Sequence, residues 1–124
     1  MHRPPVSQNT KRLDDTLVIF TSDNGFFWGE HGRGDKRMAY EESIRVPLLM
    51  RYPKLIAAGA NRPELALNVD IGPTLLDLAG AEIPKTMHGR SLLPLLKGDS
   101  GGRRTSVLTE YFAHSHNRIP SRQS

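Results

Sequence analysis

Two short runs of apolar residues predict the strands of this chain. The first, at positions 17–20, reads LVIF and contains no polar residue. An unbroken run that includes β-branched residues is typical of a strand buried on both faces, as in a parallel sheet covered by helices. The second run, at 46–52, is followed by a proline and predicts another buried strand, in which Pro47 is tolerated only among the first residues or beside an unpaired neighbour.

The clearest helical pattern lies at positions 70–80. From Ile71 onward, apolar residues recur at i, i+4, i+7 and i+8, which places them on one face of a helix. Asp70 is expected to cap the start of this helix, and Gly80 is expected to close its end.

Shorter elements are predicted around these. Residues 36–43 and 92–96 are expected to form short helices, and residues 105–112 alternate enough to predict a strand. Glu41 and Arg45 stand four residues apart, and we expect them to form an ion pair.

The composition fits one small domain rich in loops. The chain has 124 residues, of which 37% are hydrophobic, with 9 prolines and 11 glycines. Cysteine is absent, which excludes disulfides and thiolate metal sites. No apolar run approaches the roughly 20 residues of a membrane span.

The formal net charge is +4, and much of the basic excess lies near the two ends of the chain. These residues are interpreted as solvated surface: Arg3, Lys11, Arg12, Arg103, Arg104, Arg118 and Arg122. Nucleic-acid binding is poorly supported, because no predicted helix carries a basic stripe and aromatic residues do not interleave with the charges.

A turn with metal-binding potential follows the first predicted strand. It consists of Asp23, Asn24 and Gly25. In open α/β sheets, ligands bind at the carboxyl ends of the strands. Carboxylate and amide oxygens are hard donors of the kind that Ca²⁺ or Mg²⁺ accepts. An Asx turn at a strand end is the commoner fate of such a pair, so the residue types alone leave both interpretations open.

The residues after this turn form a cationic loop. His31, Arg33 and Lys36 follow within eleven residues, without a long apolar run between them, and together they are able to meet an anion. An isolated lysine is normally a surface charge, and a loop histidine is as often bonded to the backbone as to a ligand. His114 and His116 either line a substrate pocket or, more simply, stand exposed in a polar tail.

Six blocks in this order resemble the sulfatases, the sulfuric ester hydrolases of the alkaline-phosphatase-like superfamily. The blocks are residues 16–25 (TLVIFTSDNG), 29–32 (GEHG), 35–37 (DKR), 40–47 (YEESIRVP), 70–80 (DIGPTLLDLAG) and 88–96 (HGRSLLPLL). The resemblance implies an incomplete α/β sandwich of the alkaline-phosphatase-like type, with buried mixed or parallel strands covered by helices. Sulfatases are several times longer than 124 residues, so we expect a piece of such an enzyme.

The expected organisation has three parts. Residues 1–13 form an irregular segment, because two adjacent prolines disfavour a helix there. Residues 14–112 correspond to the C-terminal part of a sulfatase catalytic domain, and residues 113–124 form a polar tail.

The resemblance also implies roles for the candidate residues. Asp23 and Asn24 match ligands of the divalent cation, Ca²⁺ or Mg²⁺. Lys36 matches a lysine that binds the sulfate group of the ester substrate. His31 lies on the same loop and could bond the ester oxygen or a substrate hydroxyl.

The family nucleophile is missing from the chain. In sulfatases it is formylglycine, made from the first residue of a Cys/Ser-x-Pro-Ser-Arg motif. Residues 118–122 read RIPSR, but Arg118 stands at the nucleophile position and arginine cannot become formylglycine. We therefore expect the isolated chain to be inactive. The alternatives are a fragment of a related phosphonate monoester or phosphodiester hydrolase, and a non-catalytic remnant.

Overall fold

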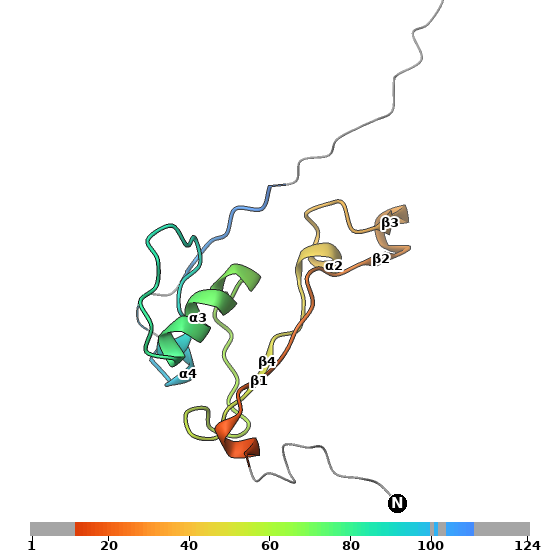
Figure 1. Cartoon of the computed structure of the whole chain (residues 1–124). Helices are drawn as coiled ribbons and strands as arrows, with labels where there is room; N and C mark the ends of the chain where they lie inside the picture. Colours follow the sequence, from red (N-terminus) through yellow and green to blue (C-terminus); the bar gives the residue numbers. More distant parts are fainter. Residues whose placement is uncertain (1–11, 100, 102–103, 111–124) are drawn as a thin grey trace, which may run out of the picture. The chain divides into compact units, whose positions relative to one another are not determined.

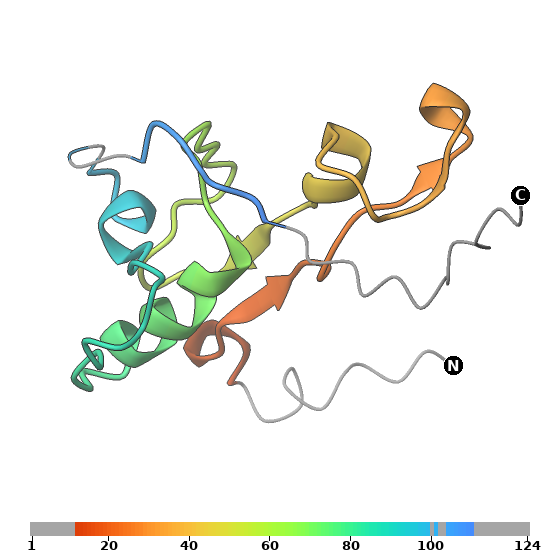
Figure 2. The same cartoon turned by 90° about the horizontal axis from the view of Figure 1, so that it is seen from above.

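The computed structural model describes residues 12–99, 101 and 104–110, and these residues form two compact units. Of the described residues, the first unit includes those at 12–23 and 46–107, and the second includes those at 24–45 and 108–110. Figures 1 and 2 show the elements of each unit from two directions. No helix in the described part of the chain is long and apolar enough to cross a membrane.

Both predicted strands form in the first unit, and each is shorter than predicted. Strand β1 (Val18–Phe20) pairs antiparallel with β4 (Leu49–Arg51), with Ile19 opposite Met50. The two strands lie side by side in Figures 1 and 2. The apolar runs therefore located the strands, but they do not encode strand direction, and the only pairing of β1 among the described residues is antiparallel.

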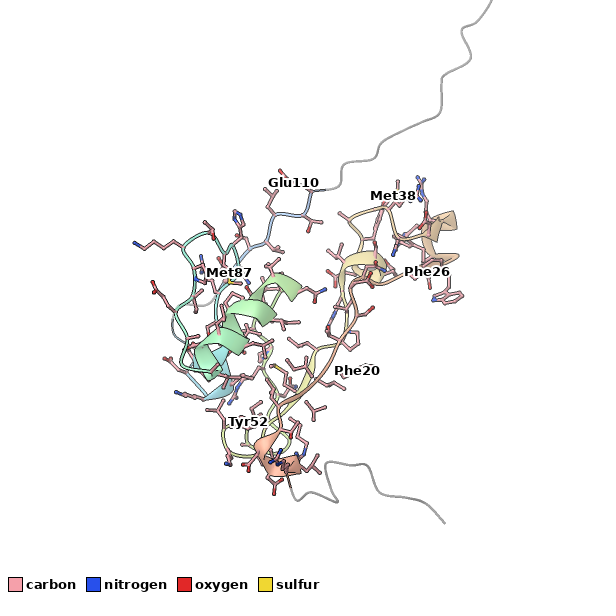
Figure 3. The ribbon with its side chains drawn as sticks, in the orientation of Figure 1. Phe20, Phe26, Met38, Tyr52, Met87 and Glu110 are labelled. Carbon is pink, nitrogen blue, oxygen red and sulfur yellow. The ribbon has the colours of Figure 1, made fainter. Side chains whose placement is uncertain are left out.

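Among the described residues, the predicted burial of this sheet on both faces is not found. Val18 is 44% exposed, while Phe20 and Leu49, which face each other across the ladder, are 61% and 63% exposed. Figure 3 shows the side chain of Phe20 on the ribbon of β1. An apolar run indicates that both faces of the strand carry apolar side chains suited to burial. The described residues do not bury both of these faces in β1 and β4.

The predicted helix at 70–80 is confirmed at its end and corrected at its start. The 3-10 helix η3 (Asn68–Asp70) leads into α3 (Ile71–Leu78). Gly80 has a φ of 69°, and the N–H of Ala81 bonds the carbonyl of Leu76, which is a Schellman motif. The Asp70 side chain does not cap α3. Its carboxylate turns back and accepts the N–H of Leu67, three residues earlier.

The core of the first unit lies where the start of α3 meets the segment before α4 (Leu93–Leu96). Asp70, Pro73 and Thr74 are fully buried there, and Leu92 is 5% exposed. Gly89 allows the close approach, because a Cβ atom at this position would lie 1.9 Å from the carbonyl oxygen of Val69. The predicted short helix at 92–96 thus forms as α4, with its proline in the first turn.

The second unit contains a hairpin that sequence patterns did not predict. Strand β2 (Phe27–Trp28) pairs antiparallel with β3 (Gly34–Asp35), and the 3-10 helix η2 (Glu30–Gly32) fills the loop between them. Helix α2 (Glu41–Ile44) follows, so only the end of the predicted helix at 36–43 is helical. Gly25 packs against α2, where a Cβ atom would lie 2.0 Å from the carbonyl oxygen of Glu42.

The remaining local predictions have mixed outcomes. The Glu41–Arg45 ion pair forms at 3.6 Å, with both side chains more than 70% exposed, so it contributes about 0.3–0.5 kcal/mol. The strand predicted at 105–112 is wrong for residues 105–110, which adopt no regular structure, and residues 111–112 lie outside the described part. His114, His116 and the RIPSR segment also lie outside the described residues.

Candidate active site

Asp23 follows β1 directly, at the end of the first unit. Its side-chain Oδ1 accepts a hydrogen bond from the Ser22 hydroxyl at 3.4 Å. The backbone around it is held by Asn68 of η3, whose Nδ2 donates to the carbonyls of Ser22 and Asp23 at 2.9 and 3.1 Å. Asn68 thereby fixes the turn that presents the Asp23 carboxylate to solvent. Sequence reasoning missed this role, because the two segments lie about 45 residues apart and no local pattern links them.

Asn24, the first residue of the second unit, has a defined side-chain orientation. Its Nδ2 donates to the carbonyl of Gly25 at 2.8 Å, which leaves Oδ1 as the acceptor on the other side of the amide. That oxygen accepts a hydrogen bond from Lys36 Nζ at 2.7 Å. Two candidate residues that are 12 positions apart in the sequence therefore lie in direct contact.

The backbone of Lys36 is fixed on both sides. Its N–H donates to Asp35 Oδ1 at 2.8 Å, and its carbonyl accepts the Ser43 hydroxyl at 2.5 Å. Asp35 has a φ of 81°, which is uncommon for a residue with a side chain, and its other oxygen pairs with Arg37 Nε at 2.9 Å. The Lys36 side chain is thus attached to an ordered turn, although it is itself exposed.

His31 is held by side chains of the same unit. Its ring stacks on Tyr40 with centroids 4.5 Å apart, and its Nε2 lies 3.2 Å from Glu42 Oε1. The φ of 56° at His31 turns the loop sharply at this point. The imidazole of His31 is therefore oriented by a carboxylate. The His31 side chain nevertheless stays 46% exposed. The prediction that His31 contacts the substrate stays a prediction.

The donor set near Asp23 fits part of a metal site. Asp23 and Asn24 offer a carboxylate and an amide oxygen in consecutive residues, which suits Ca²⁺ or Mg²⁺. The part of the chain that the structure describes contains no group of three or more His, Cys, Asp or Glu side chains that could hold a metal ion. Calcium takes about six to eight oxygen ligands, so this pair could supply only some of them.

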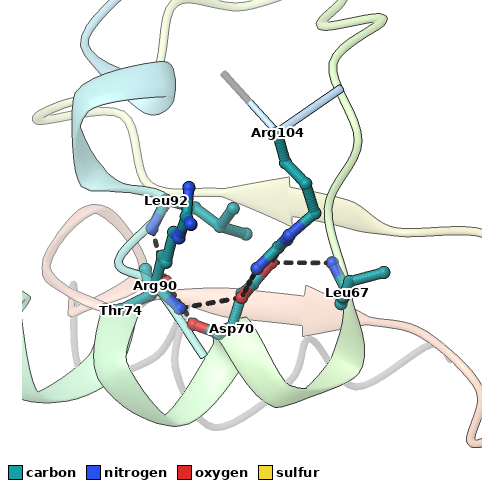
Figure 4. A network of polar contacts seen from close by, with 6 residues as sticks. All are labelled: Leu67, Asp70, Thr74, Arg90, Leu92 and Arg104. Atoms are coloured by element: carbon teal, nitrogen blue, oxygen red, sulfur yellow. Dashed lines mark hydrogen bonds and ion pairs between the residues drawn. The ribbon is translucent and has the colours of Figure 1, made fainter. Parts of the chain in front are cut away.

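A second polar cluster surrounds the buried carboxylate of Asp70 (Figure 4). Arg104 approaches it with two guanidinium nitrogens, at 2.7 and 3.1 Å, and the backbone N–H groups of Leu67 and Arg90 each donate at 2.8 Å. Thr74 extends the cluster: its hydroxyl donates to the Asp70 carbonyl and accepts the N–H of Leu92. The cluster ties η3, the loop before α4 and the segment after α4 together.

The electrostatics of Asp70 reflect this arrangement. Burial alone would raise the pKa of this carboxyl group, but the Arg104 guanidinium and the two backbone N–H groups outweigh burial and hold the pKa below its ordinary value. The same pairing raises the pKa of Arg104. The interpretation of Arg104 as solvated surface is therefore wrong: its side chain is 15% exposed and bound to a fully buried partner.

Comparison with known proteins identifies the family. The family model for the C-terminal region of N-sulphoglucosamine sulphohydrolase matches residues 29–123, which is most of the chain. The chain belongs to this sulfatase family. The resemblance seen in the sequence blocks is thereby confirmed.

The curated relatives are sulfatases that are much longer than this chain. An N-acetylglucosamine-6-O-sulfatase of Bacteroides thetaiotaomicron is 52% identical over 87 residues, which cover 70% of this chain and 16% of that protein. The human N-acetylglucosamine-6-sulfatase is 44% identical over 111 residues, covering 87% of this chain and 20% of that protein. The chain thus spans a fifth or less of the length of these relatives.

Solved structures confirm the α/β fold as part of an alkaline-phosphatase-like domain. A protein solved in complex with its substrate, D-glucosamine-2-N,6-O-disulfate, superposes with a TM-score of 0.83 at 42% identity, over 88% of this chain and 23% of that one. A phosphonate monoester hydrolase from Silicibacter pomeroyi gives a TM-score of 0.73 at 33% identity, over 77% of this chain and 19% of that one.

Proposed function

We propose that this chain forms one wall of the active site of a sulfuric ester hydrolase acting on a sulfated glucosamine. The hydrogen bond between Lys36 Nζ and Asn24 Oδ1, at 2.7 Å, carries the proposal. It joins the candidate sulfate-binding cation to a candidate metal ligand. A sulfate ester needs both at one place, because its oxygens are held by positive charge from more than one side.

Asp23 and Asn24 would hold a divalent cation through their side-chain oxygens. Such a cation, when bound, polarises the sulfate oxygens as a Lewis acid. The Asn24 amide is suited to this role, because the hydrogen bond from Nδ2 to the Gly25 carbonyl fixes the orientation of the amide and leaves Oδ1 on the side away from that carbonyl. The Asp23 carboxylate is presented on a turn whose backbone carbonyls accept hydrogen bonds from Asn68.

Lys36 would bind a non-bridging oxygen of the sulfate group. An ammonium group has three N–H donors, and Asn24 uses one of them. The remaining donors can therefore reach the substrate while the first keeps the side chain in place. Negative charge shifts toward the leaving oxygen as the S–O bond breaks, and a fixed cation stabilises that transition state.

His31 would donate a hydrogen bond to the leaving ester oxygen or to a substrate hydroxyl. Glu42 orients its ring from one side, and Tyr40 supports the ring face. An imidazole held in this way can pass a proton to the departing alcohol without first reorganising. The nucleophile would come from another part of the enzyme. This sequence contains no Cys, and no Ser stands at the nucleophile position of the family motif.

Two substrate classes are separated by a direct assay. Sulfated glucosamine is supported by relatives of 44–52% identity, whereas phosphonate monoesters are supported by a structural match at 33% identity. We expect a full-length enzyme that contains this chain to hydrolyse glucosamine 6-sulfate with a kcat/KM at least tenfold above that for a phenyl phosphonate monoester, a difference of about 1.4 kcal/mol in transition-state stabilisation. The reverse order would favour the phosphonate reaction.

A further inference from the structure

One aromatic side chain of the hairpin is displayed to solvent. Trp28 is 85% exposed, the largest fraction among the large apolar side chains of the described residues. It stands opposite Gly34 across the β2–β3 ladder, and a Cβ atom at Gly34 would meet no other atom within 4 Å. No side chain of the opposite strand therefore covers the indole ring.

The ring is nevertheless well supported. Successive side chains of a strand point to opposite faces, so the buried Phe27 anchors β2 while Phe26 and Trp28 share the other face. The Phe26 and Trp28 rings lie 5.0 Å apart at an angle of 56°. The backbone N–H of Trp28 donates to Glu30 Oε2 at 2.5 Å, so the backbone at this position is held as well. Figure 3 shows Phe26 on this part of the ribbon.

The surroundings of Trp28 favour a polar occupant with an apolar face. Between positions 26 and 37 the chain carries three cations and two carboxylates: Arg33, Lys36, Arg37, Glu30 and Asp35. Arg37 and Asp35, although paired, remain 69% and 46% exposed. A protein surface packed over this hairpin would have to bury these charges, which is costly. A sugar ring offers C–H groups to the indole and hydroxyls to the polar rim.

We propose that Trp28, supported by Phe26, is the stacking platform for the pyranose ring of the substrate. This inference rests on the proposed function, because the same hairpin carries the candidate sulfate-binding Lys36. Gly34, the partner of Trp28, lies two residues from Lys36, at most roughly 7 Å along the chain. On this proposal, a sulfated hexose places its sulfate on Lys36 and its ring on Trp28. Trp28 therefore selects sugar esters over other sulfate esters.

The test separates sugar binding from sulfate binding. In a full-length enzyme that contains this chain, the inhibition constants of N-acetylglucosamine and of inorganic sulfate are measured for Trp28→Ala and Trp28→Phe. We expect Trp28→Ala to weaken inhibition by the sugar roughly fivefold, and to raise KM for the sulfated sugar similarly, since aromatic stacking is worth about 1 kcal/mol. Inhibition by sulfate should change less than about twofold, and Trp28→Phe should restore most of the sugar affinity.

Leu108→Ala is the matched control, because Leu108 is a large apolar residue of similar exposure, 82%. It should leave both inhibition constants unchanged. An unchanged inhibition constant of the sugar in Trp28→Ala would contradict the assignment of Trp28 as the stacking platform. The assignment would also be contradicted if the sugar and sulfate both bound more weakly by the same factor and the unfolding temperature fell. Calorimetric titration with N-acetylglucosamine needs no turnover. The two proposals can therefore be tested separately. An active sulfatase in which Trp28→Ala does not change sugar binding would contradict only the stacking platform, and an inactive protein that still binds the sugar would contradict only the proposed activity.

Discussion

Two polar clusters of this chain use similar side chains in opposite ways. Around Asp70 the carboxylate is fully buried, and four hydrogen bonds occupy its two oxygens. Around Lys36 the polar groups are half-buried or exposed, and the ammonium group gives one bond to Asn24. The first cluster has no capacity left for a ligand and holds the fold. The second is ordered by its backbone contacts and keeps donors available.

The buried cluster should respond to mutation in stability. Arg104→Ala leaves the Asp70 carboxylate buried without its cation, and removing one partner of a buried pair costs about 3–5 kcal/mol. We expect a corresponding fall in the urea midpoint of the full-length enzyme. Arg90→Ala is the matched control, since Arg90 contacts Asp70 through its backbone N–H, which the substitution retains. Equal destabilisation by both variants would contradict the structural role of Arg104.

The same cluster predicts a dependence of stability on acid. The pKa of Asp70 lies below its ordinary value of 3.8 in the folded chain, so its stabilising contribution is complete above that value. The contribution is lost as the pH falls from about 3.8 through the lower folded-state pKa. Arg104→Ala should therefore lose less stability than the parent over this window. A parallel loss in both proteins, measured by unfolding at each pH, would assign acid sensitivity to other groups.

The exposed cluster should respond in activity instead. Lys36→Ala in the full-length enzyme should lower kcat/KM for a sulfate ester by on the order of a hundredfold, because a fixed cation at the transition state is lost. Unfolding temperature and metal content should stay near those of the parent. Arg37→Ala, which removes the neighbouring exposed cation, provides the comparison. Kinetics of Lys36→Ala within about twofold of the parent would make Lys36 a surface charge.

A smaller effect is expected from the residue that orients His31. Glu42 positions the ring without being assigned a contact to substrate, so Glu42→Ala should lower kcat by up to roughly tenfold and leave KM nearly unchanged. Glu42→Gln retains a hydrogen-bonding oxygen and should recover most of the rate. If KM rises instead, or if Gln is no better than Ala, the contact serves the packing of the loop against α2.

Local signals in the sequence predicted the elements that local forces stabilise. The runs at 17–20 and 46–52 indicated β1 and β4, because consecutive apolar side chains need a buried strand. Gly80 indicated the end of α3, because a left-handed residue closes a helix there. The β2–β3 hairpin was missed since strands of two residues carry no detectable alternation.

The longer-range contacts had no comparable signal. Asp70 has the residue type of a helix cap, yet its main partner, Arg104, lies 34 positions away. The Lys36–Asn24 contact also depends on the fold of the hairpin, and only the family resemblance placed both residues at one site. Residue types offered Asp23, Asn24, His31 and Lys36 as candidates, and the family resemblance selected them, whereas the contacts of Asn68 and Arg104 became evident only from the structure.

Metal content tests the central account most directly. We expect the full-length enzyme and its Asp14→Asn control, which removes an exposed carboxylate that precedes β1 in the sequence, to retain Ca²⁺ or Mg²⁺ after exhaustive dialysis. Asp23→Ala should lose most of the bound ion, because a carboxylate ligand contributes charge as well as an oxygen. Elemental analysis of the three proteins gives the answer. Undiminished metal in Asp23→Ala would contradict the assignment of this turn as the metal-binding wall of the site.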